Sequence, residues 1–146
     1  MVNWLMVRDI LGHGDPAGSN IYFYTDNIDT GLIRMGPLWD FDMAFEMSES
    51  WSLQHDVGFL PFEYAWQSAD FRKKYTAKWV SMAPTIEKEL FDALDGLAAS
   101  EGKAIERSRT RNSNIWGDPK TLSSEIEAEK AFFTKQLAWI NAQLSP

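Results

Sequence analysis

The stretch that decides the fold is DPAGSNIYFYTDNIDTGLIRMGPLWDFD, residues 15–42. It begins with a segment dense in Gly, Asp and Pro, which is typical of an irregular loop of defined shape. Residues 21–25 are rich in β-branched and aromatic side chains and predict a strand. Residues 32–35 predict a second strand, and the polar residues between them predict a turn. An acidic motif at residues 39–42 follows the hairpin. Along the sequence the order is therefore loop, hairpin and acidic motif.

The acidic residues of this stretch have the spacing that phosphoryl transfer requires. Asp15 and Asn20 form a D-x-x-x-x-N loop, which protein kinases use for the carboxylate beside the attacking hydroxyl and for one Mg²⁺ ligand. Asp40 follows the hairpin, where a second Asp supplies the other ligand. Asp40 and Asp42 alternate with large apolar residues, so an extended chain points both carboxylates to one side. Their mutual repulsion favours a hard cation with oxygen ligands, Mg²⁺, and hence ATP as co-substrate.

Structural alternatives remain open for each of these residues. Asp15 before Pro16 could form a simple turn, with Asn20 capping the strand that follows, because Asp and Asn are common turn residues. Asp40 and Asp42 could form a polar turn after a strand. A glycosidase acid and nucleophile is a further alternative, with less support, because neighbouring carboxylates on one strand do not by themselves flank a sugar.

Other catalytic chemistries have little support in the sequence. The chain has no cysteine and two histidines, His13 and His55, so no zinc-binding cluster is expected. No serine lies in a G-x-S-x-G elbow, which argues against a Ser-His-Asp hydrolase. His13 precedes Asp15 by two positions, and we expect it to hold the loop backbone through hydrogen bonds.

Composition predicts one globular domain and limits the partners. The 146 residues are 45% hydrophobic, 24% charged and 14% aromatic, as expected for a packed core with large side chains. The net charge of −7 argues against nucleic-acid binding. No apolar run approaches the ~20 residues of a membrane span. Arg107, Arg109 and Arg111 form a local basic patch, for which we expect a solvated helix face, with contact to a phosphorylated substrate as the alternative.

The single domain, residues 1–146, divides into three parts. Residues 1–45 hold a short helix over about 2–10, the loop and the hairpin. Residues 46–67 lack a clear period and predict a long loop or lid. Residues 68–146 are helical: one helix ends before Pro84, the next reaches about residue 99, and a polar helix spans about 104–115. Asp118 before Pro119 predicts the start of a long final helix. The fold class is α+β, mostly helical.

At these residues the chain resembles the CotH kinase family, which is named for a spore coat protein and includes surface proteins of bacteria and fungi. The resemblance covers most of the chain, and PLWDFD is its most specific element. The matching segments are Asn3-Trp4 with the following helix, Asp15, residues 20–24, residues 36–45, residues 69–79 and residues 105–116.

The resemblance implies the C-terminal lobe of an atypical protein-kinase-like fold that transfers the γ-phosphate of ATP to a protein hydroxyl. It implies Asp15 as the catalytic-loop carboxylate and Asn20 and Asp40 as Mg²⁺ ligands, with Asp42 as an alternative or auxiliary ligand. It also implies a cell-surface, extracellular or spore-coat location. The chain departs from the family pattern at Glu46, where a Gly is common, and at His13-Gly14, where the family often has Asn-Trp.

The sequence lacks the motifs of the nucleotide-binding lobe of a kinase. Neither a Gly-rich phosphate loop nor a strand lysine with a helix glutamate precedes Asp15. We therefore expect a fragment of a longer protein with a separate N-terminal lobe, and little activity from this chain alone. The alternatives are a non-catalytic surface or spore-coat assembly module that binds protein partners, and a carbohydrate-binding module that uses the aromatic residues of 46–67.

Overall fold

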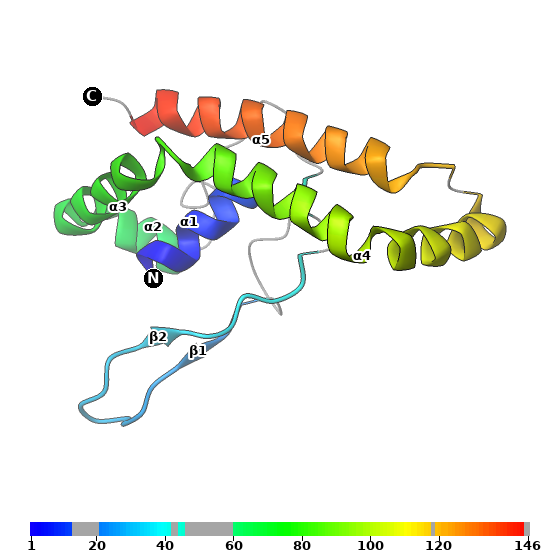
Figure 1. Ribbon diagram of the computed structural model, residues 1–146. Helices are drawn as coiled ribbons and strands as arrows, with labels where there is room; N and C mark the ends of the chain where they lie inside the picture. The colour runs from blue at the N-terminus through cyan, green and yellow to red at the C-terminus, as the bar shows by residue number, and fades with distance from the viewer. Residues whose placement is uncertain (13–20, 42–43, 46–59, 118, 145–146) are drawn as a thin grey trace.

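The computed structural model describes residues 1–12, 21–41, 44–45, 60–117 and 119–144. It is mostly helical with one small antiparallel sheet (Figure 1), which confirms the α+β, mostly helical class. In chain order the elements are α1 (Val2–Leu11), β1 (Phe23–Tyr24), β2 (Arg34–Met35), α2 (Leu60–Gln67), α3 (Ala69–Met82), α4 (Ile86–Trp116) and α5 (Leu122–Leu144).

Helix α1 lies at the centre of the core, in contact with α3 and α5. Its apolar residues Leu5, Met6 and Ile10 are buried, and they share one hydrophobic cluster with α2, α3 and α5. Spacings of one, four and five residues place these side chains on one stripe of the helix. Each such side chain stabilises the fold by about 1.5–3 kcal/mol through burial. The short N-terminal helix predicted over residues 2–10 is confirmed.

Gly12 ends α1 in the left-handed conformation, with φ of 57°. Its N–H donates to carbonyl oxygens of the last turn, those of Arg8 and Asp9. A Cβ at this position would lie 2.6 Å from Cζ of Phe132 on α5. Both the backbone angle and the close approach of α5 therefore require glycine at the point where the predicted catalytic loop begins.

The predicted hairpin is present, but its strands are shorter than residues 21–25 and 32–35. Phe23 pairs with Met35 and Tyr24 with Arg34. In the turn the side chain of Asn27 accepts hydrogen bonds from the N–H groups of Asp29 (2.8 Å) and Thr30 (3.0 Å). The hairpin projects from the helical body as an arm (Figure 1). A two-stranded ribbon without a covering layer is only marginally stable, which accounts for the short pairing.

The loop or lid predicted over residues 46–67 is partly wrong, because residues 60–67 form α2. Residues 46–59 lie outside the described part of the chain. The ring of Phe62 is fully buried, with its centroid 5.6 Å from that of Trp4. This packing against α1 stabilises a helix that the local sequence does not indicate.

Helix α3 agrees with the sequence prediction. The Ser68 hydroxyl accepts a hydrogen bond from the Phe71 N–H at 3.3 Å, and the helix ends at Met82, before Pro84. Tyr75 and Trp79 are buried, as the helical spacing of the aromatic residues predicts.

Helix α4 is one continuous helix from Ile86 to Trp116, so the prediction of two helices separated near Gly102 is wrong. A glycine inside a helix costs only about 1 kcal/mol relative to alanine. Packing along α5 offsets this cost, and α4 makes its contacts with α5 through half-buried side chains.

Helix α5 begins at Leu122, which places its start after the predicted Asp118-Pro119 signal. Thr121 and Ser124 exchange side-chain to backbone hydrogen bonds of 3.0 and 3.1 Å, an arrangement that satisfies N–H groups at a helix start. A carboxylate oxygen of Glu106 on α4 accepts a hydrogen bond from the Leu122 N–H. The start of α5 is therefore set by Thr121, Ser124 and the neighbouring helix.

Candidate functional site

Asp40 lies at the base of the hairpin, in the segment that follows β2, and its side chain is exposed. Its backbone has φ of 57°, and Phe45 nearby has φ of 66°. Non-glycine residues rarely adopt this left-handed conformation, which persists only where the surroundings hold it in place. Such positions cluster at functional sites, and Asp40, which the sequence pattern indicates, is one of two non-glycine residues with positive φ in the described part of the chain.

The residues after Asp40 are anchored to the core. The Arg8 guanidinium lies 5.8 Å from the centroid of the Phe41 ring and 5.0 Å from that of Trp4. Ala44 is buried, and the N–H of Phe45 donates to the carbonyl oxygen of Leu11 at 3.1 Å. These contacts attach Phe41 and Phe45 to α1.

The aromatic ring of Phe45 attaches the same segment to α5. Its centroid lies 5.5 Å from those of Phe132 and Phe133, in edge-to-face geometry for both pairs. Edge-to-face pairs add about 0.5–1.5 kcal/mol beyond the burial of their area. The chain leaving Asp40 is therefore fixed from two sides, at the end of α1 and on α5.

The two ends of the predicted catalytic loop lie in this same region. Leu11 and Gly12 precede the loop, and the carbonyl of Leu11 is the group that binds the Phe45 N–H. Ile21 follows the loop and belongs to the buried core cluster. The structure thus brings Leu11, which precedes residues 13–20, into contact with Phe45, which follows residues 42–43.

Of the predicted site residues, the structure places Asp40. Asp15, Asn20 and Asp42 lie outside the described residues, as do His13 and His55. Their predicted roles therefore stay predictions. Within residues 1–12, 21–41, 44–45, 60–117 and 119–144, no group of three or more His, Cys, Asp or Glu side chains could hold a metal ion.

The Asp40 carboxylate has the type of oxygen atom that binds Mg²⁺. Mg²⁺ prefers hard oxygen ligands and keeps several waters, so it binds through carboxylates that are open to solvent. Asp40 is exposed and offers such oxygens.

Sequence reasoning missed a buried polar group beside the site. Arg8 and Asp9 are buried, with 0% and 3% of their surface exposed. The Tyr75 hydroxyl donates a hydrogen bond to Oδ2 of Asp9, and Gln136 Nε2 donates to the Asp9 carbonyl at 2.6 Å. In the helical pattern of α1, Asp9 occupies a core-facing position, and this spacing could have predicted its burial.

Burial raises the pKa of Tyr75 above its usual value, and the charge of Asp9 and their hydrogen bond raise it further. Tyr75 therefore stays a neutral donor to the Asp9 carboxylate. This contact joins α1 to α3 in the last turn of α1. No described helix is long and apolar enough to cross a membrane.

A family model described as CotH kinase protein matches residues 1–140. The curated proteins give no match to the chain, and the solved structures give none either.

Proposed function

We propose, because the chain belongs to the CotH kinase family, that it is the catalytic lobe of a kinase-like phosphotransferase. In this proposal the enzyme transfers the γ-phosphate of ATP to a hydroxyl group of a protein. The proposal rests on Asp40. Its carboxylate is exposed, its backbone is left-handed, and it lies in the acidic motif within the region that the family model matches.

The proposed roles follow the spacing of the acidic residues. Asp15 accepts or orients the proton of the attacking hydroxyl, and Asn20 and Asp40 hold Mg²⁺, with Asp42 as an auxiliary ligand. When bound, Mg²⁺ would neutralise charge on the phosphates. Phosphoryl transfer needs little from the protein beyond positioning and electrostatic stabilisation, so fixed placement of these oxygens is what the fold must supply.

The anchoring of the flanking residues supports this proposal. The carbonyl of Leu11, immediately before the loop that carries Asp15, is bound by Phe45, which follows the motif that carries Asp40. Ile21, immediately after Asn20, is part of the same core. A site that forms from the two segments would therefore be held by α1 and α5.

We further propose that the nucleotide clamp comes from a lobe outside these residues. Val2–Leu11 form α1, and the sequence before Asp15 contains neither a Gly-rich loop nor a strand lysine. The family name is consistent with a spore-coat or surface role, and that location is part of the proposal.

A second candidate function is an assembly module that binds protein partners without catalysis. The hairpin favours it, because Ile28, Leu32 and Ile33 are 91%, 77% and 74% exposed. Clustered exposed apolar residues are typical of surfaces that another protein covers.

The experiment that separates these functions is a thermal-shift titration of the full-length protein with ATP and Mg²⁺. The kinase proposal predicts stabilisation that requires both, because a ligand that binds only the folded protein raises its Tm. Asp40→Asn should remove the Mg²⁺-dependent part. Asp29→Asn is the matched control, because it makes the same change in the exposed turn of the same hairpin.

Indifference of the wild-type protein to ATP and Mg²⁺ would contradict the kinase proposal and favour the assembly module. An Mg²⁺-dependent shift that Asp40→Asn and Asp29→Asn both retain would contradict the role of Asp40.

A further inference from the structure

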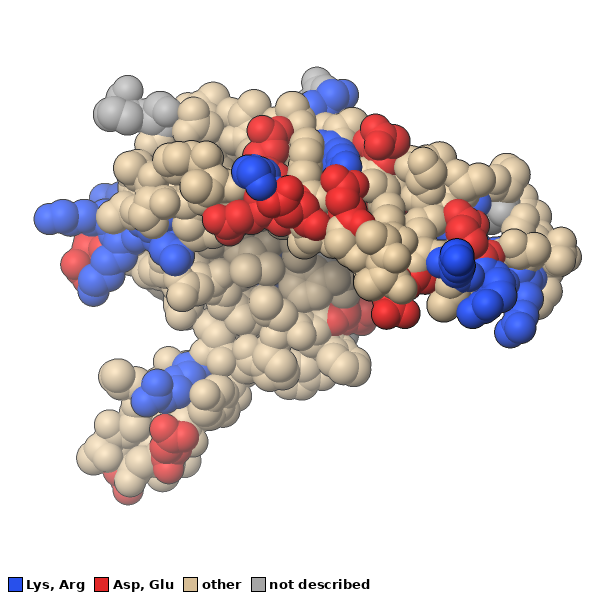
Figure 2. All heavy atoms as spheres, in the orientation of Figure 1, with Lys and Arg blue, Asp and Glu red and all other residues tan. Residues whose placement is uncertain are grey.

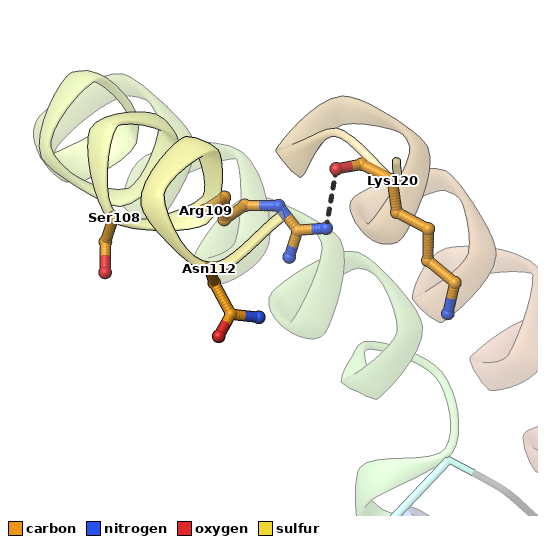
Figure 3. A pocket seen from close by; sticks show the side chains of 4 residues that line it. All are labelled: Ser108, Arg109, Asn112 and Lys120. Carbon is orange, nitrogen blue, oxygen red and sulfur yellow. Dashed lines mark hydrogen bonds between the residues drawn. The ribbon is translucent and has the colours of Figure 1, made fainter. Parts of the chain in front are cut away.

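Among the described residues, Arg8 is the only Lys or Arg that is buried, with 0% of its surface exposed. Figure 2 shows Lys and Arg side chains on the surface, over α3 and over the C-terminal end of α4, where Arg107 and Arg111 are exposed. Arg109 links α4 to the segment before α5, because its Nη2 donates to the Lys120 carbonyl at 2.9 Å (Figure 3). A cation removed from water is costly, so a fully buried arginine indicates a use for its charge.

The Arg8 guanidinium contacts two aromatic rings. Its Cζ lies 5.0 Å from the centroid of the Trp4 ring and 5.8 Å from that of the Phe41 ring. Both distances are within the range at which a cation is attracted to the face of an aromatic ring. Trp4 lies four positions before Arg8 on α1, whereas Phe41 belongs to the segment that follows β2. The guanidinium therefore connects α1 to the acidic motif through Phe41.

The position of the Phe41 ring restricts the residue before it. Asp40 has a left-handed backbone with φ of 57°, a conformation that a non-glycine residue keeps only where its surroundings hold it. Because Asp40 is bonded directly to Phe41, a ring held against Arg8 limits the backbone angles available at Asp40. The exposed carboxylate of Asp40 is thus oriented by a contact that lies inside the core.

A second contact with α1 holds the other end of the same segment. The Phe45 N–H donates to the Leu11 carbonyl at 3.1 Å, and the Ala44 N–H donates to the Phe41 carbonyl at 3.0 Å. Arg8 and Leu11 are three positions apart, which is about one turn of a helix. Helix α1 therefore holds Phe41 and Phe45 at points about one turn apart, and the hydrogen bond between Ala44 and Phe41 sets the turn between them.

Stability of the core alone does not explain an arginine at this position. Methionine has a similar helix propensity, and apolar residues that replace buried charges are often neutral or stabilising. The interaction that a cation adds, and that an apolar side chain lacks, is attraction to the faces of both rings. The planar guanidinium suits this stacking better than an ammonium group does. The use of the charge is therefore to hold Phe41 on α1.

We propose that Arg8 is a positioning residue for Mg²⁺ binding at Asp40. Its guanidinium holds the Phe41 ring against α1, and the ring keeps the Asp40 carboxylate in the orientation that receives the ion. Arg8 is fully buried, so it acts through Phe41 and not by contact with the ion. This inference rests on the proposed function, because it takes Asp40 as a Mg²⁺ ligand.

The first measurement is the Mg²⁺ affinity of the full-length protein, taken from the rise of Tm with Mg²⁺ concentration at saturating ATP. Arg8→Met removes the charge and Phe41→Leu removes the ring. We expect each to weaken Mg²⁺ binding about fivefold, as loss of one buried cation–π contact predicts. The double variant should weaken it no further than either single variant, because both substitutions remove the same contact.

The matched control is Ile140→Val, which shortens a buried side chain of α5 and lowers stability without touching either ring. It should bind Mg²⁺ like the wild type. Phe41 is half-buried, so Phe41→Leu serves for both measurements if Arg8→Met does not fold.

The second measurement is hydrogen–deuterium exchange of the full-length protein without Mg²⁺ or ATP, which tests the positioning itself. Arg8→Met and Phe41→Leu should speed exchange at the amides of Ala44 and Phe45 about fivefold, because these amides report opening of the segment. Ile140→Val should speed it less.

Unchanged exchange at Ala44 and Phe45 in Arg8→Met would overturn the proposal whatever the Mg²⁺ affinity. Faster exchange with wild-type Mg²⁺ affinity would also overturn it, as would equal loss of affinity in Ile140→Val. A wild-type protein that does not respond to Mg²⁺ and ATP would contradict the proposed function and, with it, the role of Arg8 toward Mg²⁺. Exchange data would then show separately whether Arg8 anchors the segment.

Discussion

Asp9 ties α1 to two other helices through single atoms. Its side chain accepts a hydrogen bond from the Tyr75 hydroxyl on α3. Its backbone carbonyl accepts a hydrogen bond from Gln136 Nε2 on α5. A buried carboxylate is costly unless hydrogen bonds satisfy its oxygens. The contact therefore holds α1 in register with α3 and α5, close to the end of the helix from which the predicted catalytic loop starts.

Tyr75→Phe tests this contact. The substitution keeps the buried ring and removes the donor to Asp9, so we expect a loss of about 1–3 kcal/mol in the free energy of unfolding. Urea denaturation measures it. Tyr64→Phe is the matched control, because Tyr64 is 65% exposed, and it should change stability by less than about 0.5 kcal/mol. Equal effects of the two substitutions would contradict the role assigned to the Tyr75 hydroxyl.

Gly12→Ala tests the junction between α1 and the loop. Alanine would take a left-handed φ at a cost of about 1 kcal/mol, and its Cβ would meet Phe132. We expect thermal unfolding at a lower temperature than the wild type. Gly96→Ala provides a control of opposite sign: nothing lies within 4 Å of its added Cβ, so helix propensity should stabilise it by about 0.5–1 kcal/mol. A Gly12→Ala protein as stable as the wild type would show that the junction adapts to a side chain.

On α5, Glu129 lies in an environment that disfavours the negative charge of its carboxylate. Partial burial of Glu129 raises its pKa, and the charge of Glu125 raises it further. The folded protein therefore binds this proton more tightly than the unfolded chain does. The resulting stabilisation is fully present below the unfolded-state pKa of Glu129 and is lost as the pH rises through its higher folded-state pKa.

Glu129→Gln should consequently raise the Tm at neutral pH, because glutamine removes the charge that the fold disfavours. The advantage over the wild type should disappear as the pH falls and the wild-type carboxyl takes up its proton. Thermal melts across a pH series measure this difference. Glu127→Gln, on an exposed position of the same helix, serves as the comparison. An advantage that is independent of pH would contradict the electrostatic explanation.

Local sequence predicts elements well where neighbours along the chain determine them. Ser68 as a helix cap, Pro84 as a break and the turn around Asn27 all follow from short-range preferences. Helix α2 was missed because Phe62 is held by Trp4, nearly sixty positions away. The unbroken course of α4 through Gly102 likewise depends on α5. These errors occur where tertiary packing outweighs propensity.

At the scale of the whole molecule, the candidate site lies where α1, α5 and the base of the hairpin meet. Sequence spacing indicated Asp40, and the structure adds its left-handed backbone and the anchoring of Phe41 and Phe45. Sequence could not predict these contacts, because they join residues 8, 11 and 132 to the acidic motif across long separations. The exposed hairpin is a part of the surface that suits a partner.

We propose that this lobe supports transfer of the ATP γ-phosphate through Asp15. The most direct test is Mg²⁺-dependent phosphorylation by the full-length protein with radiolabelled ATP, comparing the wild type, Asp15→Ala and the hairpin control Asp29→Asn. If Asp15 has this role, label is expected on protein with the wild type and with Asp29→Asn, and none with Asp15→Ala. Absence of label with the folded wild-type protein, or undiminished label with Asp15→Ala, would contradict it.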